Sequence, residues 1–297
     1  FFETCFSFAQ VRCGIEQYDS MRRLKNPKLE TKEEFENWLQ SKIQNPSNPS
    51  LRTQSTFIVP VVIHIIHSGI NSNANISDAQ VQSQINVLNE DFLRLNADAS
   101  ETPTEFKPVA GSMSIEFVLA KQDPLGNPTN GILRVDGGKP EWHLYEDAEL
   151  KSKSYWPAEQ YLNIWVTDFA EYLGYTQFPV SILAGLSDSS HDRLTDGIIV
   201  HYRAFGSGDQ FNLGPQYDKG RTLTHEMGHF FGLRHIWGDE NSCAATDFVA
   251  DTPPQIGSSS NCPNHPSIEC SGQAKMFQNY QDYTDDRCMN IFTQGQV

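Results

Sequence analysis

The chain has 297 residues, more than one average domain, and 38% of them are hydrophobic, which is enough to form a real core. Its formal net charge of −15 leaves no basic surface for a phosphate backbone, so nucleic acid is excluded as an expected partner. The longest apolar run, residues 57–67, has the length of a strand and not of a membrane span.

The N-terminal part of the chain differs in composition from the rest. Residues 1–9 are expected to be the remnant of a secretory signal peptide, because the SFA triplet that ends at Ala9 has the small-x-small pattern of a cleavage site. Residues 16–44 are charged and carry apolar side chains with helical periodicity, which predicts one or two helices. Residues 44–55 combine prolines, serines and asparagines without an apolar pattern and are predicted to be an exposed linker.

The main domain begins with a predicted strand and alternates strands with helices. Residues 77–96 are predicted to form a helix with Ser77 as its N-cap. The strand candidates, each rich in β-branched and aromatic residues, are 56–67, 114–120, 161–168 and 196–202. We therefore expect an α+β fold, in which a twisted mixed sheet with two long helices is followed by an irregular half.

Four cysteines cluster in the last fifth of the chain, at Cys243, Cys262, Cys270 and Cys288. An even number of cysteines in a loop-rich region predicts two disulfides formed in an oxidising compartment, with three possible pairings. A structural zinc site is the alternative, but no pair has the short C-x₂₋₄-C spacing that is typical of such sites.

The stretch HEMGHFFGLRH at 225–235 contains the candidate metal-binding and catalytic residues. Residues four apart project from the same face of a helix, so His225 and His229 can bind one metal ion together. Glu226 faces the same cavity, where it can polarise a water without ligating the ion. Gly232 lets the chain leave the helix sharply, and His235 can return as a third ligand. Three imidazoles leave one zinc position open, which is the catalytic pattern and not the structural one.

This motif is the signature of metzincin zinc proteases. Together with RCG at 12–14, HIWGD after His235, DTPPQ at 251–255 and the stretch 278–296, it makes the chain resemble the pappalysin family, particularly its bacterial ulilysin-like branch. The resemblance implies a metzincin-type fold. The sheet, a backing helix and the active-site helix would form an N-terminal subdomain that ends near residue 232, above an irregular C-terminal subdomain held by disulfides.

The resemblance also implies roles for individual residues. The zinc ligands would be His225, His229 and His235, and Glu226 would be the general base. Tyr283 would help to hold the oxyanion, although a core aromatic is the alternative. The late cysteines would pair as Cys243 with Cys270 and Cys262 with Cys288. A structural calcium ion would be bound by Asp247, Asp251 and Thr252.

Two positions depart from the family pattern. The turn under the zinc normally reads N-x-M-D-Y, but Gln281 stands here in place of the methionine, and a buried amide without partners costs about 1–3 kcal/mol. Arginine-specific relatives have an acidic residue just before the last cysteine, in the pocket for the side chain after the scissile bond, where this chain has Arg287. Arg287 could attract Asp or Glu, or it could turn to solvent and pair with Asp285 or Asp286.

The N-terminal segment is expected to inhibit the enzyme. RCG resembles the cysteine switch of metzincin zymogens, in which the Cys13 thiolate would fill the fourth zinc position. Residues 10–51 would then be an inhibitory prosegment with its linker, and residues 52–297 the catalytic domain. Leu51-Arg52 is one candidate for the activating cleavage. The alternative is a disulfide between Cys13 and Cys5.

We therefore expect a secreted, monomeric proenzyme of a zinc metalloendopeptidase that acts on protein or peptide substrates. Substrate is expected to lie antiparallel to an edge strand, for which residues 174–181 are the candidate. A catalytically silent, zinc-binding module such as an adhesin is the main alternative. A calcium-dependent binding module with an incidental histidine cluster is a third possibility.

Overall fold

The structure, a computed structural model, describes residues 10–44, 56–179 and 190–297. Its strands are β1 (Val11–Cys13), β2 (Phe57–His67), β3 (Ile115–Leu119), β4 (Ile132–Asp136), β5 (Leu162–Thr167), β6 (Tyr172–Thr176) and β7 (Ile198–His201). Its α-helices are α1 (Ile15–Lys25), α2 (Lys32–Gln44), α3 (Asp78–Phe92), α4 (Asp147–Ser152) and α5 (Arg221–Phe230). None of the described helices is long and apolar enough to cross a membrane.

The seven described strands form one mixed sheet in the order β1-β6-β7-β5-β2-β3. The first half of β2 pairs with β3, and its second half pairs with β4. The pairs between β2, β3, β4, β5 and β7 are parallel, whereas β6 runs antiparallel to β7. Strand β6 would be the sheet's edge if β1 were not there. The mixed sheet expected from the sequence is confirmed, but β4 and β1 were not among the predicted strands.

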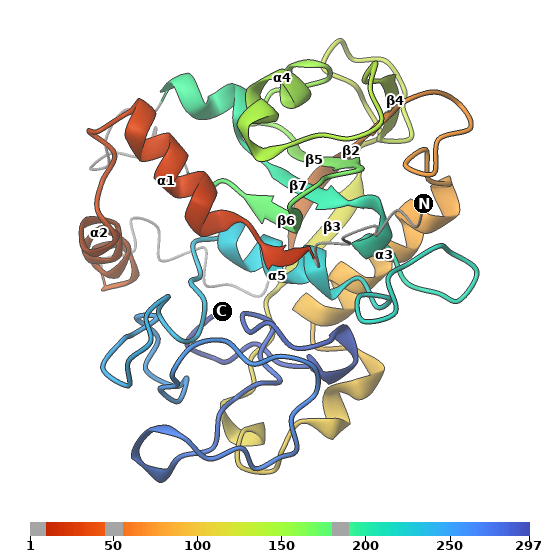
Figure 1. The fold of residues 1–297 in the computed structure, drawn as a ribbon. Coiled ribbons are helices and arrows are strands. Elements are labelled where there is room, and N and C mark those ends of the chain that lie inside the picture. The colour runs from red at the N-terminus through yellow and green to blue at the C-terminus, as the bar shows by residue number, and fades with distance from the viewer. Residues whose placement is uncertain (1–9, 45–55, 180–189) are drawn as a thin grey trace, which may run out of the picture.

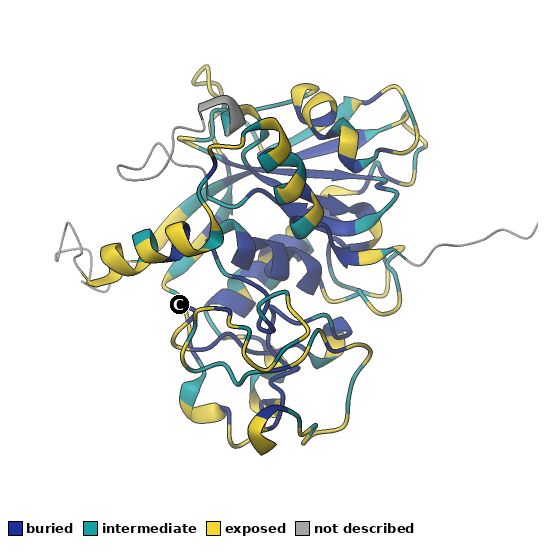
Figure 2. Ribbon diagram, turned by 60° about the vertical axis from the view of Figure 1, so that its left-hand side comes forward, coloured by how far each residue is buried: buried dark blue, intermediate teal, exposed yellow. Residues whose placement is uncertain are grey.

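The two faces of the sheet pack against different elements. Val61, Ile63 and Ile65 of β2 belong to the main core with α3 and α5, and the intervening Val62 and Ile66 belong to clusters on the other face. Strands β5, β6 and β7 and helix α5 are largely buried, and Figure 2 shows dark blue strands and helix at the centre of the molecule. Both faces of this central strand are covered, which explains why β2 is apolar at nearly every position.

Helix α3 is the backing helix that the sequence predicted. The Ser77 hydroxyl accepts a hydrogen bond from the backbone N–H of Gln80, as expected of an N-cap. The helix ends at Phe92, earlier than residue 96, because Arg94 adopts a left-handed conformation with φ of 53° that no helix can continue.

The chain after Gly232 is irregular and contains only short 3₁₀ turns and isolated bridges. In Figure 1 these blue loops lie on the opposite side of α5 from the sheet. The loops enclose a small core of their own, which includes Ile236, Trp237 and Met276. Two disulfides join them, Cys243–Cys270 with Cα atoms 5.6 Å apart and Cys262–Cys288 with Cα atoms 5.8 Å apart. This is the pairing that the family resemblance implied.

The N-terminal segment packs beside strand β6. Strand β1 extends the sheet beyond β6, and α1 and α2 continue from it along one side of the molecule (Figure 1). Residues 1–9 and 45–55 lie outside the described residues, and with them the expected signal remnant, Cys5, most of the linker and the Leu51-Arg52 bond. Cys13 is a free and buried cysteine.

Candidate active site

Helix α5 and the turn after it bring three imidazoles together. His225 and His229 lie one turn apart on α5, and both are fully buried. Gly232 has a φ of 97°, a left-handed conformation that glycine adopts without strain, and it turns the chain so that His235 comes back toward the helix. The His229 Nε2 atom lies 3.1 Å from the Nε2 atoms of both His225 and His235.

Each ring is oriented through its other nitrogen. The Nδ1 atom of His225 lies 2.7 Å from the Tyr280 carbonyl oxygen, and that of His229 lies 2.7 Å from the Leu233 carbonyl oxygen. These carbonyls can only accept, so each Nδ1 donates and each Nε2 carries a lone pair into the cluster. Burial lowers the pKa of His225 and of His229 well below the usual value, and both rings are therefore neutral.

The third ring, His235, has a carboxylate behind it. Its Nδ1 atom lies 2.5 Å from an Asp239 carboxylate oxygen, and its ring stacks on the indole of Trp237 at 4.3 Å. Three imidazole nitrogens that converge at these distances fit a cation between them. The donor set therefore fits a zinc ion, which takes imidazole nitrogens readily.

Cys13 completes the cluster from the N-terminal segment. Its sulfur and the three histidine nitrogens all lie within 4.8 Å of one another, as a group that could hold a metal ion. Strand β1 brings it there by pairing in parallel with β6, in the register Cys13 opposite Gly174. Burial, and then the charge of Glu226, raise the pKa of the Cys13 thiol, so a thiolate here depends on a cation.

The sequence RCG also has a packing reason for its glycine. A Cβ atom on Gly14 would lie 2.8 Å from the ring of Tyr172, closer than real contacts allow. The missing side chain lets the segment lie close beside β6 before α1 begins at Ile15.

Glu226 follows His225 and is fully buried. Neither of its carboxylate oxygens makes a hydrogen bond of normal geometry to any described residue. Burial raises the pKa of Glu226 to about 8, although the nearby Cys13 side chain opposes the shift. A buried carboxyl group without a partner is costly, and its retention beside the histidines is typical of a catalytic acid or base.

Tyr283 faces the same cluster. Its ring centroid lies 4.8 Å from that of His235 and 5.6 Å from that of His225. Burial, and then the neighbouring Cys13 and Glu226, raise the pKa of Tyr283 well above the usual value. The phenol therefore stays protonated and can donate a hydrogen bond.

Gln281 lies directly under α5 and is fully buried. Its side-chain amide N–H donates to the carbonyl oxygen of His225 at 2.9 Å, while its side-chain oxygen has no partner among the described residues. The amide rests against Gly228, where a Cβ atom would overlap it. One of the two polar groups of the Gln281 side chain is thus hydrogen-bonded. Gln281 contacts helix α5 at the place where the family has a methionine.

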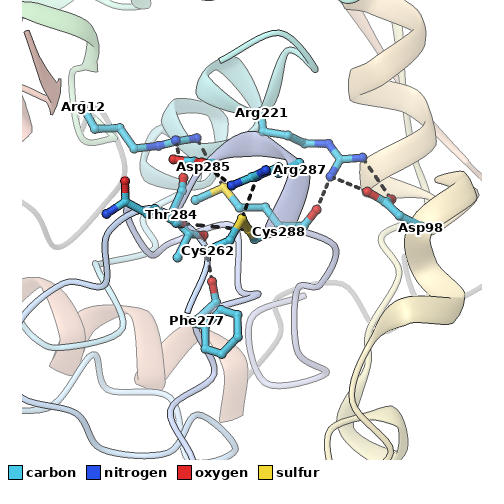
Figure 3. Close-up of a disulfide and its surroundings, with 11 residues drawn as sticks. Arg12, Asp98, Arg221, Cys262, Phe277, Thr284, Asp285, Arg287 and Cys288 are labelled. Atoms are coloured by element: carbon cyan, nitrogen blue, oxygen red, sulfur yellow. Dashed lines mark hydrogen bonds and ion pairs between the residues drawn. A yellow bond between two sulfur atoms is a disulfide. The ribbon is translucent and has the colours of Figure 1, made fainter. Parts of the chain in front are cut away.

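Arg287 lies at the surface. Its side chain is 65% exposed and forms an ion pair with Asp285, and its Nε atom lies 3.2 Å from the Cys262 sulfur (Figure 3). The neighbouring Asp286 is instead fully buried. It accepts hydrogen bonds from the backbone N–H groups of Lys219 and Arg221 at the start of α5.

Arg12 of the N-terminal segment is buried and contacts Asp286 and Thr284. Its guanidinium donates to an Asp286 carboxylate oxygen at 3.0 Å and to the Thr284 carbonyl oxygen at 2.6 Å. The ring of Tyr217 lies 5.3 Å from the same group. Reasoning from sequence missed this pair, because the acidic residue was sought one position later; the adjacent Asp285 and Asp286 were the clue.

The residues expected to bind calcium are brought together only in part. The Thr252 hydroxyl lies 2.8 and 2.9 Å from the two carboxylate oxygens of Asp247. Asp251 instead accepts from the Thr293 hydroxyl at 2.6 Å and from the Gly295 backbone at 2.8 Å. Burial raises the pKa of Asp247 to about 7. The carboxyl group of Asp247 forms no ion pair with a described residue.

Comparison with known proteins identifies the chain. The family model Peptidase_M43, described as pregnancy-associated plasma protein-A, matches residues 145–297. An extracellular metalloprotease of Arthroderma otae is 31% identical over 242 residues, which are 80% of this chain and 74% of that protein. The chain belongs to the pappalysin family. It is a metalloendopeptidase, and its family implies a catalytic zinc ion.

Solved pappalysin structures agree with this. Mature mirolysin of Tannerella forsythia, in complex with a cleaved peptide, is 45% identical with a TM-score of 0.75, covering 82% of this chain and 89% of that one. A promirolysin mutant of the same organism is 41% identical with a TM-score of 0.80, covering 96% of this chain and 91% of that one. The family, the fold class and the enzyme class expected from the sequence are confirmed.

Proposed function

We propose that this pappalysin is the latent proform of a secreted, monomeric zinc endopeptidase that cleaves protein or peptide substrates before arginine. The observation that carries the proposal is the convergence of three imidazole nitrogens and the Cys13 sulfur beside Glu226, whose buried carboxyl group has no hydrogen-bond partner among the described residues. The extracellular relatives support secretion. A catalytically silent module has no use for that carboxyl group or for a blocking cysteine.

His225, His229 and His235 would hold the zinc ion, which when bound supplies Lewis acidity to the attacking water and to the peptide carbonyl. Glu226 takes a proton from that water and later passes it to the leaving amine. Tyr283 donates a hydrogen bond to the negative charge that develops on the carbonyl oxygen. Asp239 keeps the His235 ring in the orientation that points its Nε2 atom at the metal.

Residues 10–51 would keep the enzyme latent. Cys13 would take the zinc position that the attacking water needs, and β1 covers the β6 edge where a substrate backbone would bind. Because β1 runs parallel to β6, it lies in the direction opposite to the expected antiparallel substrate. A prosegment strand in this direction presents no peptide bond in the orientation that attack requires, so the prosegment would resist cleavage at this site.

Because a substrate would run in the direction opposite to β1, the position of Arg12 also indicates which substrate side chain would bind there. In an antiparallel substrate, the residue after the scissile bond would lie where Arg12 lies before Cys13. The buried carboxylate of Asp286 would therefore receive an arginine or lysine side chain of the substrate. Cleavage at Leu51-Arg52 would suit this preference, so the proform could process itself.

Calcium is proposed as a structural ion. Asp247 and Thr252 would supply oxygen ligands in the loop after the zinc motif, and Asp251 would join them only if it left Thr293. A cation beside Asp247 would relieve the cost of burying its carboxylate, which is what the raised pKa reports.

The proposed function is tested on the enzyme trimmed to residue 52 and supplied with zinc and calcium. It should cut an arginine-containing peptide on the N-terminal side of the arginine, and both Glu226→Ala and removal of zinc should abolish cleavage. A trimmed, zinc-loaded protein that cuts no peptide would contradict the proposal.

A further inference from the structure

Arg234 is a buried cation next to the third histidine. Its side chain is 5% exposed, and its Nε atom donates to a Glu36 carboxylate oxygen at 2.8 Å. Three phenyl rings surround the guanidinium, with centroids 6.0 Å away for Phe35, 5.2 Å for Phe178 and 5.7 Å for Phe248. A charge at this depth is stable only with a charged partner, and Glu36 is that partner.

The partner comes from the N-terminal segment. Glu36 and Phe35 lie on α2, the largely exposed helix at the left of Figures 1 and 2, and are the two side chains of α2 that are buried. Glu36 is the one carboxylate that forms an ion pair with Arg234 in the part of the chain that the structure describes. Release of residues 10–51 would therefore remove both the carboxylate and one of the rings.

The position of Arg234 along the cleft follows from the strand directions. Arg12 lies where the residue after the scissile bond would lie, and β1 then runs past Cys13 in the same direction as β6. Phe178 follows the end of β6 and faces His229, with ring centroids 5.9 Å apart. Arg234 on Phe178 thus lies on the N-terminal side of the scissile bond.

We propose that Arg234, together with Phe178 and Phe248, forms a subsite of the processed enzyme for a substrate aspartate or glutamate that precedes the scissile bond. The inference rests on the proposed function and adds a second specificity to it. The prosegment fills both subsites with the matching charges, Arg12 on Asp286 and Glu36 on Arg234. A guanidinium between aromatic rings keeps its donors aligned for a bidentate carboxylate partner.

The test uses the trimmed enzyme and peptides with one arginine after the scissile bond. A single glutamate is placed at each preceding position in turn, and kcat/KM is compared with that of the same peptide carrying glutamine. We expect about a tenfold preference for glutamate at one position, since a charge-assisted hydrogen bond outweighs a neutral one by this factor.

Variants at Arg234 then test whether this residue causes the preference for glutamate. Arg234→Gln should bring the glutamate-to-glutamine ratio to about 1, Arg234→Lys should keep part of it, and Arg234→Glu should favour lysine at that position. The matched control is Arg134→Gln, at an exposed arginine paired with Asp78, which should leave the ratio as it is. Zinc content verifies that the variants retain the site next to His235.

Each outcome decides the inference. No preference at any position, or a preference that persists in Arg234→Gln, would overturn it while the cleavage before arginine still stood. If Arg234→Gln lost zinc, the inference would be decided by the glutamate-to-glutamine ratio of the wild type and of Arg234→Lys. A preference in the wild type that is partly kept in Arg234→Lys would support it, and no preference in the wild type would overturn it. A trimmed wild-type enzyme that cut none of the peptides would overturn the proposed function and this subsite with it.

Discussion

The backbone of Gly174 lies directly against the side chain of Glu226. A Cβ atom at Gly174 would come within 2.9 Å of Glu226 Cγ and 3.1 Å of its Oε1 atom. Strand β6 therefore holds the carboxyl group between its own backbone and the histidine cluster, where no described residue forms a hydrogen bond of normal geometry with it. This contact explains why a glycine interrupts an otherwise apolar and aromatic strand.

Gly174→Ala should lower kcat about 100-fold in the trimmed enzyme, because a displacement of the base by about 1 Å costs this much. The zinc content should stay at that of the wild type, since the added methyl group faces Glu226 and not the three histidines. The measurement is steady-state cleavage of an arginine peptide together with metal analysis. Full activity in Gly174→Ala would show that Glu226 is not held by this contact.

Asp286 should determine cleavage before arginine. Replacing it by asparagine removes the buried charge opposite the substrate guanidinium, which costs roughly 3 kcal/mol, or about 100-fold in kcat/KM. Arg287→Ala is the matched control, because that side chain is exposed and pairs with Asp285 instead of Asp286. If Arg287→Ala altered specificity and Asp286→Asn did not, the assignment of the pocket would be wrong.

Gln281 should be replaceable by the methionine of the family turn. The substitution removes a buried amide oxygen that has no partner among the described residues, and it loses one hydrogen bond to His225. We expect Gln281→Met to raise the free energy of unfolding by about 1 kcal/mol, with kcat unchanged. Urea unfolding of the zinc-loaded protein measures this. A lower stability would mean that the amide supports α5 more than its orphaned oxygen costs.

His64 should set part of the acid limit of stability. Burial lowers the pKa of His64 to about 4, and its ring nitrogens contact Ser154 at 2.7 Å and Asn163 at 2.9 Å. The unfolded chain takes up this proton near pH 6.5 and the folded chain near pH 4. The stabilisation is therefore complete above pH 6.5, and about 3 kcal/mol is lost as the pH falls to 4.

The pH effect of His64 is isolated by comparison with His64→Gln, with both proteins carrying Glu226→Ala to prevent self-digestion. The difference in free energy of unfolding between the two should change between pH 6.5 and 4 and stay flat above pH 7. A difference that does not vary with pH in that window would mean that His64 is charged in the folded state or is not buried.

The regular elements and the histidine cluster could be predicted because each is a local pattern. The helix after Ser77, the strand at 57–67 and the HExxH turn ending at Gly232 are encoded by residues close in sequence. Strand β1 could not be predicted, since three residues become a strand only by pairing with β6.

The proposed arginine pocket and the proposed subsite at Arg234 could not be predicted from local patterns, for the same reason. Arg12 and Asp286 are 274 positions apart, and Glu36 and Arg234 are 198 positions apart. Each pair is defined only by the folded chain. Asp286 and Arg287 are adjacent, so an error of one position in the sequence comparison reverses the charge expected in the proposed pocket.

The most direct test of latency and catalysis together is an intact-mass time course on the purified proform with zinc and calcium. Wild type and Cys13→Ala should lose the N-terminal segment, Cys13→Ala faster, and Glu226→Ala should stay whole, with new termini before an arginine. If all three stay intact, and the form trimmed by an added protease digests no protein, the chain has kept the pappalysin fold without its activity.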